Sequence, residues 1–246
     1  MPPPPHLAAW KAGFCEFWSL LKQALRGTAQ NLGRAWPWYL GLFALAVAIA
    51  WLVLQPHDDD WMKILRGGAK PNSSTRTLAQ WIGSTGDELQ FNLSVFAVLW
   101  FLFGRRQRHF WRRVAVASLV GMVFAGLICN LLRPTFGRPR PSTQSKKAVP
   151  DGMYWGRGFT GGHAYQSFPS AHTATAFGTA TAIFVAHPLV GAPVMLYAGG
   201  MAWARTAQNA HHPSDVFAGA ALGLLAGCAA GRWARQSSAP STTPIA

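Results

Sequence analysis

The fold is decided at residues 114–141, which read VAVASLVGMVFAGLICNLL followed by RPTFGRPRP. The first part contains no charged side chain, and a helix of its length nearly spans the hydrocarbon core of a bilayer. The second part brings three arginines and three prolines to the end of this run. Because proline disfavours helix in the residue before it, the helix is predicted to end near Leu132, with Arg138 and Arg140 extended toward similar sides. This pattern indicates a membrane helix that ends in a basic motif.

The composition also favours lipid as the main solvent of the chain. Hydrophobic residues make up 50% of the 246 positions and charged residues only 12%, about half the charged share of an ordinary soluble domain. A disordered or fibrous protein is excluded. Six apolar segments are expected at residues 38–54, 89–104, 114–132, 171–186, 189–203 and 216–231. We therefore predict an all-α, polytopic membrane helix bundle with six transmembrane helices.

The pattern along the chain predicts three regions. Residues 1–37 form a cytosolic arm, in which aromatic and basic residues alternate at helical spacing over 7–35. This spacing predicts an amphipathic helix on the membrane surface, and a helix packed on the protein's own cytosolic face is the alternative. Residues 38–235 form the six-span domain, and residues 236–246 a disordered tail.

The distribution of basic residues predicts the orientation. The chain has 22 basic and 8 acidic residues, a net charge of +14, so its partners should be anionic. Basic residues divide equally between the two sets of loops, but five arginines crowd residues 105–113, which places both termini in the cytosol. The unbalanced arginines and lysines after residue 132 then lie outside, where a bound anion would balance them. We predict a multi-pass protein of the cell inner membrane with its site on the periplasmic or outer side.

Three further patterns are assigned structural roles. Glycines recur every four residues at positions 219, 223, 227 and 231, which predicts a close helix-packing face. The odd number of cysteines, at positions 15, 129 and 228, argues against a disulfide framework and favours packing. The acidic run Asp58–Asp60 lacks the spacing of cation ligands and is predicted to be a solvated loop.

Three polar clusters border apolar segments, and six-span parity puts all three on the same side of the membrane. The first contains Arg133, Arg138 and Arg140, whose guanidinium groups suit phosphate oxygens. A basic surface loop is the alternative for this motif alone. In the second, Ser170 is predicted to cap a helix that places His172 in its first turn, where the helix dipole favours an anion.

The third cluster combines Arg205 with His211, Pro213 and Asp215. Pro213 suits the first position of a helix, and Asp215 lies four residues after His211, so its carboxylate can hold an imidazole N–H. This contact would fix the tautomer and leave the other ring nitrogen able to attack. A structural His–Asp cap is the alternative for this pair taken alone.

Together, the clusters resemble the three-part signature of the type 2 phosphatidic acid phosphatase superfamily. That signature reads a basic residue, six residues and Arg-Pro; then Pro-Ser-Gly-His; then Ser-Arg, five residues, His, three residues and Asp. The order and all internal spacings agree over residues 133–215. Arg133 stands for the usual Lys, Ala171 for Gly and Ala204 for Ser. None of these departures removes a catalytic group.

The resemblance implies hydrolysis of phosphate monoesters or pyrophosphates through a phosphohistidine. His211 would attack phosphorus, Asp215 would orient it, and His172 would protonate the leaving oxygen and then activate water. The phosphate oxygens would be held by side chains or backbone N–H groups of Arg133, Arg140, Arg205, Ser170 and Ala171. No cofactor and no metal ion is expected, because the guanidinium groups supply the positive charge.

The resemblance also implies a lipid phosphate as substrate and the membrane, not nucleic acid, as partner. Undecaprenyl pyrophosphate, phosphatidylglycerol phosphate, phosphatidic acid and the phosphates of lipid A all fit a site at the bilayer edge. A lipid phosphotransferase using the same phosphohistidine is one alternative. An anionic-lipid transporter is the other, although simple binding does not need a nucleophile with an orienting carboxylate and an acid. The oligomeric state stays open.

Overall fold

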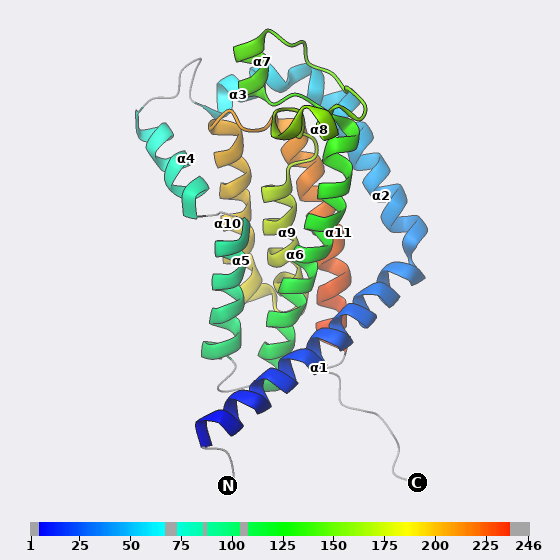
Figure 1. The fold of residues 1–246 in the computed structure, drawn as a ribbon, viewed down its shortest axis with the longest axis vertical. Helices are drawn as coiled ribbons and strands as arrows, with labels where there is room; N and C mark the ends of the chain where they lie inside the picture. The colour runs from blue at the N-terminus through cyan, green and yellow to red at the C-terminus, as the bar shows by residue number, and fades with distance from the viewer. Residues whose placement is uncertain (1–4, 67–72, 86–87, 104–107, 237–246) are drawn as a thin grey trace.

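The computed structural model describes residues 5–66, 73–85, 88–103 and 108–236, and these ranges contain helices and loops but no β-strand. In chain order the elements are α1 (Pro5–Arg34), α2 (Trp36–Ile49) continued by η1 (Ala50–Leu54) and η2 (Gln55–His57), α3 (Asp58–Leu65), α4 (Ser73–Thr85), α5 (Glu88–Ala97) continued by η3 (Val98–Leu102), α6 (Arg108–Phe136), α7 (Pro141–Lys147), α8 (Arg157–Thr160), η5 (Gly162–Tyr165), α9 (Ala171–Ala186), α10 (Pro188–Ala207) and α11 (Pro213–Gln236) (Figure 1).

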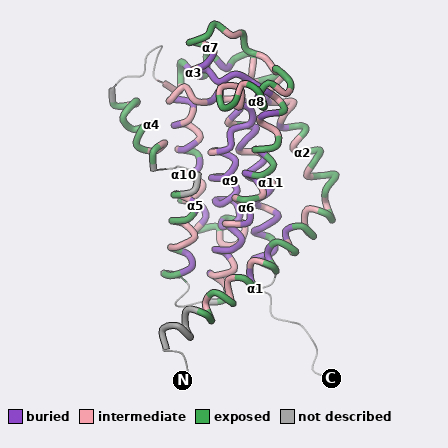
Figure 2. Tube along the Cα trace, viewed as in Figure 1, coloured by how far each residue is buried: buried purple, intermediate pink, exposed green. Residues whose placement is uncertain are grey.

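The bundle is built around α9, which packs against α6, α10 and α11. Figure 2 shows that buried residues concentrate on α6, α9 and α11, whereas α2 and α4 are mostly exposed. The long helix α1 crosses the bundle near the end where α11 finishes, and α3, α7 and α8 gather at the opposite end (Figure 1). The molecule therefore has two distinct ends, and the short helices mark one of them.

Glycines allow α11 to approach α9 closely. A Cβ added at Gly219, Gly223, Gly227 or Gly231 would lie 2.4–2.7 Å from a carbonyl oxygen on or just before α9. On the other side of α9, a Cβ at Gly121 of α6 would lie 2.7 Å from the Gly178 carbonyl. The predicted glycine packing face is thus confirmed, and small residues bring the backbones together as in other helix pairs in lipid.

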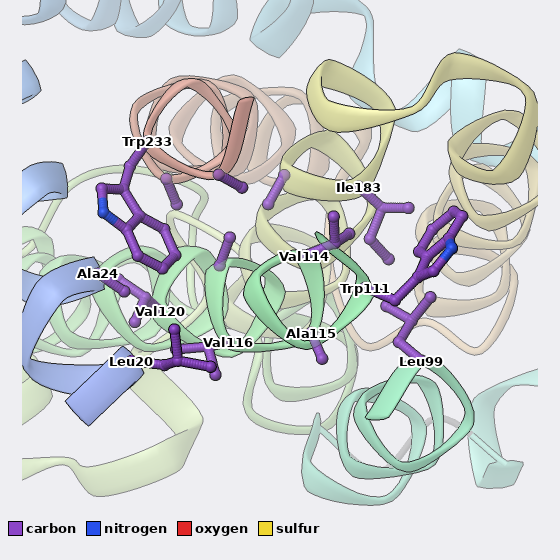
Figure 3. Packing of buried hydrophobic residues seen from close by; sticks show 14 of the residues in the cluster. Leu20, Ala24, Leu99, Trp111, Val114, Ala115, Val116, Val120, Ile183 and Trp233 are labelled. Carbon is purple, nitrogen blue, oxygen red and sulfur yellow. The ribbon is translucent and has the colours of Figure 1, made fainter. Parts of the chain in front are cut away.

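Larger side chains fill the end of the bundle beneath α1. Figure 3 shows Leu20 and Ala24 of α1 beside Val116 and Val120 of α6, with Trp233 of α11 alongside. Glu16 of α1 also forms an ion pair with Arg112 of α6. These contacts fix α1 to the bundle through one of its faces. Its other face exposes Phe14, Trp18 and Leu25.

The distribution of polar and apolar side chains is that of an integral membrane protein. α2 exposes large apolar residues such as Leu42 and Leu45, whereas α9 buries threonines such as Thr173 and Thr179. By length and composition, three helical segments among the described residues suffice to cross a membrane: Trp36–Leu65, His109–Lys147 and Pro213–Gln236. All six predicted apolar segments contain helix over their described residues. The number of six spans and the location of α1 on the membrane surface stay predictions.

The structure corrects the predicted end of α6, and it describes only the first residue of the predicted disordered tail. α6 does not end near Leu132 but continues through Pro134 to Phe136. The last turn survives because the Thr135 hydroxyl donates to the Leu131 carbonyl at 2.9 Å and the Gly137 N–H donates to the Arg133 carbonyl at 3.1 Å. The predicted disordered tail begins where α11 ends, at Gln236, and its other residues lie outside the described ranges.

Candidate active site

The three polar clusters meet at the end of the bundle marked by α3, α7 and α8 (Figure 1). Several hydrogen bonds join them directly, and two of these involve backbone carbonyls. The Ser170 N–H donates to the Asp215 carbonyl at 3.0 Å, and Arg140 Nη1 donates to the Ala210 carbonyl at 3.1 Å. The starts of α9 and α11 are therefore held together with the segment that follows α6.

His211 is fully buried in the loop that leads into α11. Its Nδ1 lies 2.8 Å from the Ser167 carbonyl oxygen. Because a carbonyl only accepts hydrogen bonds, this contact puts the imidazole proton on Nδ1 and the lone pair on Nε2. Nε2 has no hydrogen-bond partner among the described residues. The site thus presents an unprotonated, unpartnered ring nitrogen, as a nitrogen nucleophile requires.

The environment of His211 keeps its ring uncharged. Burial lowers the pKa of His211 to about 3; the carboxylate of Asp215 acts in the opposite direction, and the charge of Arg140 adds to the lowering. Desolvation disfavours the imidazolium ion because that ion loses its hydration in the protein interior. At neutral pH His211 is therefore in its neutral form.

Asp215 lies farther from His211 than its spacing in the sequence suggested. The distance from Asp215 Oδ2 to His211 Nδ1 is 3.8 Å, so the Ser167 carbonyl is the closer acceptor. Asp215 Oδ2 instead accepts hydrogen bonds from the Ser167 hydroxyl at 2.6 Å and from the His212 N–H at 2.8 Å. The carboxylate therefore fastens the two backbone segments between which the His211 ring is held.

Arg138 connects Asp215 to two other carboxylates. Its Nη1 donates to Asp215 Oδ1 at 2.7 Å, and its Nη2 donates to Asp58 Oδ2 at 2.9 Å. Nε and Nη2 also bind the two oxygens of Asp151, at 2.9 and 2.6 Å. The guanidinium is fully buried, and its carboxylate acceptors differ from the backbone carbonyls that Arg140 binds.

The prediction of a solvated loop at Asp58–Asp60 is wrong for its first residue. Asp58 is buried, because its carboxylate is drawn into the ion pair with Arg138 and also accepts from the Ser214 N–H at 2.9 Å. The Ser214 N–H lies in the first turn of α11, where backbone N–H groups have no partner within the helix. Asp58, which is distant in the sequence, supplies the acceptor. Asp59 and Asp60 are exposed in the first turn of α3.

The other arginines of the signature have different surroundings. Arg140 is buried and donates to the carbonyls of His163 at 3.0 Å, Ala210 at 3.1 Å and Gln166 at 3.3 Å. Arg205, in the last turn of α10, donates from Nη1 to Gln208 Oε1 at 3.1 Å. Arg133 contacts the Asn130 side chain one turn earlier on α6. Arg140 therefore braces the loops on both sides of the site, whereas Arg133 and Arg205 contact polar side chains.

The second cluster lies at the start of α9. Ser170 occupies the N-cap position as predicted, but its side chain makes no capping bond; its Oγ accepts from the Thr173 hydroxyl at 3.0 Å. Ala171 is buried as the first residue of the helix, and His172 follows in the first turn. Arg205, His211, Arg140 and Arg133 all lie close enough to His172 to act on its charge. The residues of all three clusters thus surround one small region.

Sequence reasoning missed several residues of this region. His163, in η5, lies near the same three arginines, and burial together with Arg140, Arg133 and Arg205 lowers its pKa. Ser167 supplies the carbonyl that fixes the His211 tautomer. Ser167 and Asp58 act through contacts between distant segments, which motif spacing does not encode. Only the proximity of His163 to the Pro-Ser-Ala-His motif offered a signal.

Comparison with known proteins gives a family match. The family model described as the PAP2 superfamily matches residues 114–238. The crystal structure of the first transmembrane PAP2 type phosphatidylglycerolphosphate phosphatase from Bacillus subtilis is similar in fold, with a TM-score of 0.53 at 20% sequence identity. That similarity covers 81% of this chain and 92% of the other.

Similar curated proteins include lipid A phosphatases. The lipid A 1-phosphatase of Rhizobium johnstonii is 35% identical over 102 residues, which are 42% of this chain and 40% of that protein. The lipid A 4'-phosphatase of Bacteroides thetaiotaomicron is 33% identical over 115 residues, covering 46% and 50% of the two chains. The matches thus span half or less of these relatives' own lengths.

Proposed function

Because the chain belongs to the PAP2 superfamily, we propose that it is an integral membrane phosphatase that hydrolyses lipid phosphate monoesters or pyrophosphates through a phosphohistidine. The observation that carries this proposal is the state of His211. Its ring is buried and neutral, its Nδ1 faces the Ser167 carbonyl, and its Nε2 has no partner among the described residues. Most buried polar atoms are hydrogen-bonded, and a nucleophilic role accounts for an Nε2 that is not.

In the proposed reaction, His211 Nε2 attacks phosphorus as the bond from phosphorus to the leaving oxygen breaks. His172 donates a proton to that oxygen, so the lipid leaves as an alcohol or a shorter phosphate. In the second step His172 accepts a proton from water, the water oxygen bonds to phosphorus, and the N–P bond breaks. Inorganic phosphate is released and both histidines return to their starting state.

The remaining residues of the signature are assigned to the phosphate oxygens. Arg133 and Arg205 supply charge from the ends of α6 and α10. The Ser170 hydroxyl and the Ala171 backbone N–H lie at the start of α9, where the helix dipole favours an anion. Arg140 holds the loops on both sides of the site through their backbone carbonyls, and it adds positive charge to the site. Asp215 positions His211 by holding Ser167 and the His212 N–H. Since these charges are supplied by the chain, the scheme uses no metal ion.

The proposed substrates are amphiphiles whose phosphate reaches the membrane edge. Lipid A phosphates are the first candidates, because they are named for relatives that are 35% and 33% identical to this chain over 102 and 115 residues. In our proposal six helices cross the inner membrane, α1 lies on its cytosolic face, and the site opens to the periplasmic or outer side. The exposed aromatic side chains of α1, Phe14 and Trp18, suit an interfacial helix.

The proposal is tested by phosphate release from a panel of purified lipid phosphates in detergent. The panel contains lipid A, phosphatidylglycerol phosphate, phosphatidic acid and undecaprenyl pyrophosphate. We expect release from at least one lipid by the wild type and none above background by His211→Gln, with Cys15→Ser as an exposed control variant. Release by a folded His211→Gln protein at the wild-type rate would contradict the proposal.

A further inference from the structure

A second basic cavity lies next to the proposed catalytic site. It has a volume of about 570 Å³ and is formed by the end of α3, one face of α4 and the loop after α10. The side chains that line it include those of Arg66, Arg76, Gln80, Gln208 and Asn209. None of the described residues that line it is acidic, so among them no carboxylate accompanies the two guanidinium groups.

The two arginines are only partly engaged by the protein. Arg66 Nη1 lies 3.4 Å from Asn209 Oδ1, at the long limit of a hydrogen bond, and its Nε is buried with no partner among the described residues. Arg76 is exposed on α4. One guanidinium group with unused N–H donors can bind two phosphate oxygens through two parallel hydrogen bonds. This geometry is more specific than the contact that an ammonium group makes. The cavity is thus suited to a phosphate group.

Gln208 separates this cavity from the catalytic region. Its Oε1 accepts from Arg205 at 3.1 Å, and its Nε2 donates to the Ala79 carbonyl of α4 at 2.7 Å. A Cβ at Gly83 would lie 2.1 Å from Gln208 Nε2, so glycine at this position leaves the room that the side chain occupies. One fixed side chain therefore stands between the cavity and an arginine assigned to the scissile phosphate.

We propose that this cavity binds a second phosphate group of the same lipid substrate, which makes the preferred substrate a lipid with two separate phosphates. The inference rests on the proposed function, since it takes the region of His211 as the place where the first phosphate is cleaved. Two phosphates on one molecule bind cooperatively, because the first contact raises the effective concentration of the second group at its site. An anionic phospholipid beside the substrate could offer the same chemistry, and the experiment separates the two sources.

The test compares bisphosphorylated lipid A with a monophosphorylated lipid A of identical acyl chains that retains the scissile phosphate. For the wild type we expect a KM about tenfold lower for the bisphosphorylated lipid, as charge-assisted hydrogen bonds to one phosphate would give. Arg76→Gln and the double variant Arg66→Gln/Arg76→Gln should raise that KM toward the value for the monophosphorylated lipid. Their kcat for the monophosphorylated lipid should stay within about twofold of wild type.

Two control variants test whether the effect depends on the position of the charge and on the geometry of the guanidinium group. Lys146→Gln removes a positive charge from the exposed surface of α7 at the same end of the molecule and should leave both KM values unchanged. Arg76→Lys, which keeps the charge but not the bidentate geometry, should restore part of the preference. Equal KM values for the two lipids in the wild type, or a preference that survives in Arg76→Gln and in the double variant, would overturn the proposal.

A third arm identifies the source of the phosphate. Phosphatidylglycerol or phosphatidylcholine is added to micelles of the monophosphorylated lipid. If phosphatidylglycerol alone changes KM in the wild type but not in the double variant, the cavity binds a neighbouring lipid, and its assignment to the substrate is overturned. Absence of phosphate release from every lipid would instead contradict the proposed function, because the monophosphorylated lipid reports the catalytic site alone.

Discussion

At the scale of the residue, Arg138 determines the shape of the site more than any arginine assigned to substrate. Its guanidinium links Asp58 after α2, Asp151 after α7 and Asp215 in α11. All three of its nitrogens bind carboxylates, and the group is fully buried. In the proposed mechanism Arg138 acts through Asp215, which in turn holds the segments around His211.

Replacement of Arg138 tests this structural role. Arg138→Gln leaves three carboxylates near one another without their cation, and loss of one partner of a buried ion pair costs about 3–5 kcal/mol. We expect a large decrease in the thermal unfolding midpoint in detergent, with Lys147→Gln as an exposed control of the same charge change. An unchanged midpoint combined with a raised KM would show instead that Arg138 binds the substrate.

The low pKa of His211 predicts how stability depends on pH. In the unfolded chain a histidine binds a proton near pH 6.5, whereas burial lowers the pKa of His211 in the folded protein to about 3. The unfolded state therefore binds more protons between these values, so stability is complete above pH 6.5 and declines as the pH falls toward 3. At pH 5 the loss from this residue amounts to about 2 kcal/mol.

The measurement is the unfolding midpoint of wild type and His211→Gln at pH 7 and pH 5. His211→Gln lacks the titrating ring, so its midpoint should fall less between the two pH values than that of the wild type. An equal decrease in both proteins would mean that His211 is already charged in the folded state and does not present a lone pair.

At the scale of the element, the α9–α11 pair positions both histidines of the proposed mechanism: His172 lies in the first turn of α9, and His211 lies in the loop that leads into α11. The starts of the two helices are aligned by the hydrogen bond from the Ser170 N–H to the Asp215 carbonyl, and the glycines of α11 keep their axes close below it. A change in the spacing of these helices would move His172 relative to His211. Helix packing far from the site is thus coupled to the geometry of the reaction.

Two matched glycine substitutions test the close packing of these helices. In Gly223→Ala the new Cβ would lie 2.4 Å from the Ala174 carbonyl, so the helices must separate, at a cost of about 1–3 kcal/mol. In Gly199→Ala the Cβ meets nothing within 4 Å, and alanine in a helix is favoured over glycine by roughly 0.5–1 kcal/mol. The unfolding midpoints should therefore shift in opposite directions. Similar shifts of the same sign would contradict the close packing of α9 and α11.

The elements also show what sequence alone can predict. Apolar runs and the four-residue glycine spacing predicted the helices and the α11 packing face, because both are local properties of the chain. The persistence of α6 past Pro134 and the burial of Asp58 depend on partners that only the fold brings near. For the same reason the motif spacing indicated which residues gather at the site but not that Arg140 would bind carbonyls or that Ser167 would contact His211.

At the scale of the whole molecule, the candidate site and the end of α11 lie at opposite ends of the bundle (Figure 1). Exposed apolar side chains such as Leu52, Leu127 and Leu196 cover the surface between them. In the proposed arrangement, a bilayer around this surface separates the site from the helix α1. The two ends of the molecule should therefore be accessible from different sides of the membrane.

Labelling with a membrane-impermeant maleimide tests this orientation. Cys15 is exposed on α1 and serves as a native marker of one end, whereas Cys129 is buried. In intact spheroplasts we expect labelling of Ser145→Cys, on α7, in a Cys15→Ser background, and labelling of Cys15 only after permeabilisation. Labelling of Cys15 from outside would place the site in the cytosol and exclude outer-leaflet lipids as substrates.

The central claim is that His211 carries the phosphoryl group, and a trapped intermediate tests it most directly. His172→Gln removes the proposed proton donor and water activator, but p-nitrophenyl phosphate has a leaving group that departs without a proton donor. With this substrate His172→Gln should form the N–P bond and hydrolyse it slowly. Mass spectrometry after alkaline denaturation should then find one phosphoryl group, on His211, and none in His172→Gln/His211→Gln. A burst of p-nitrophenol without phosphorylated His211, or a phosphoryl group on another residue, would contradict the account.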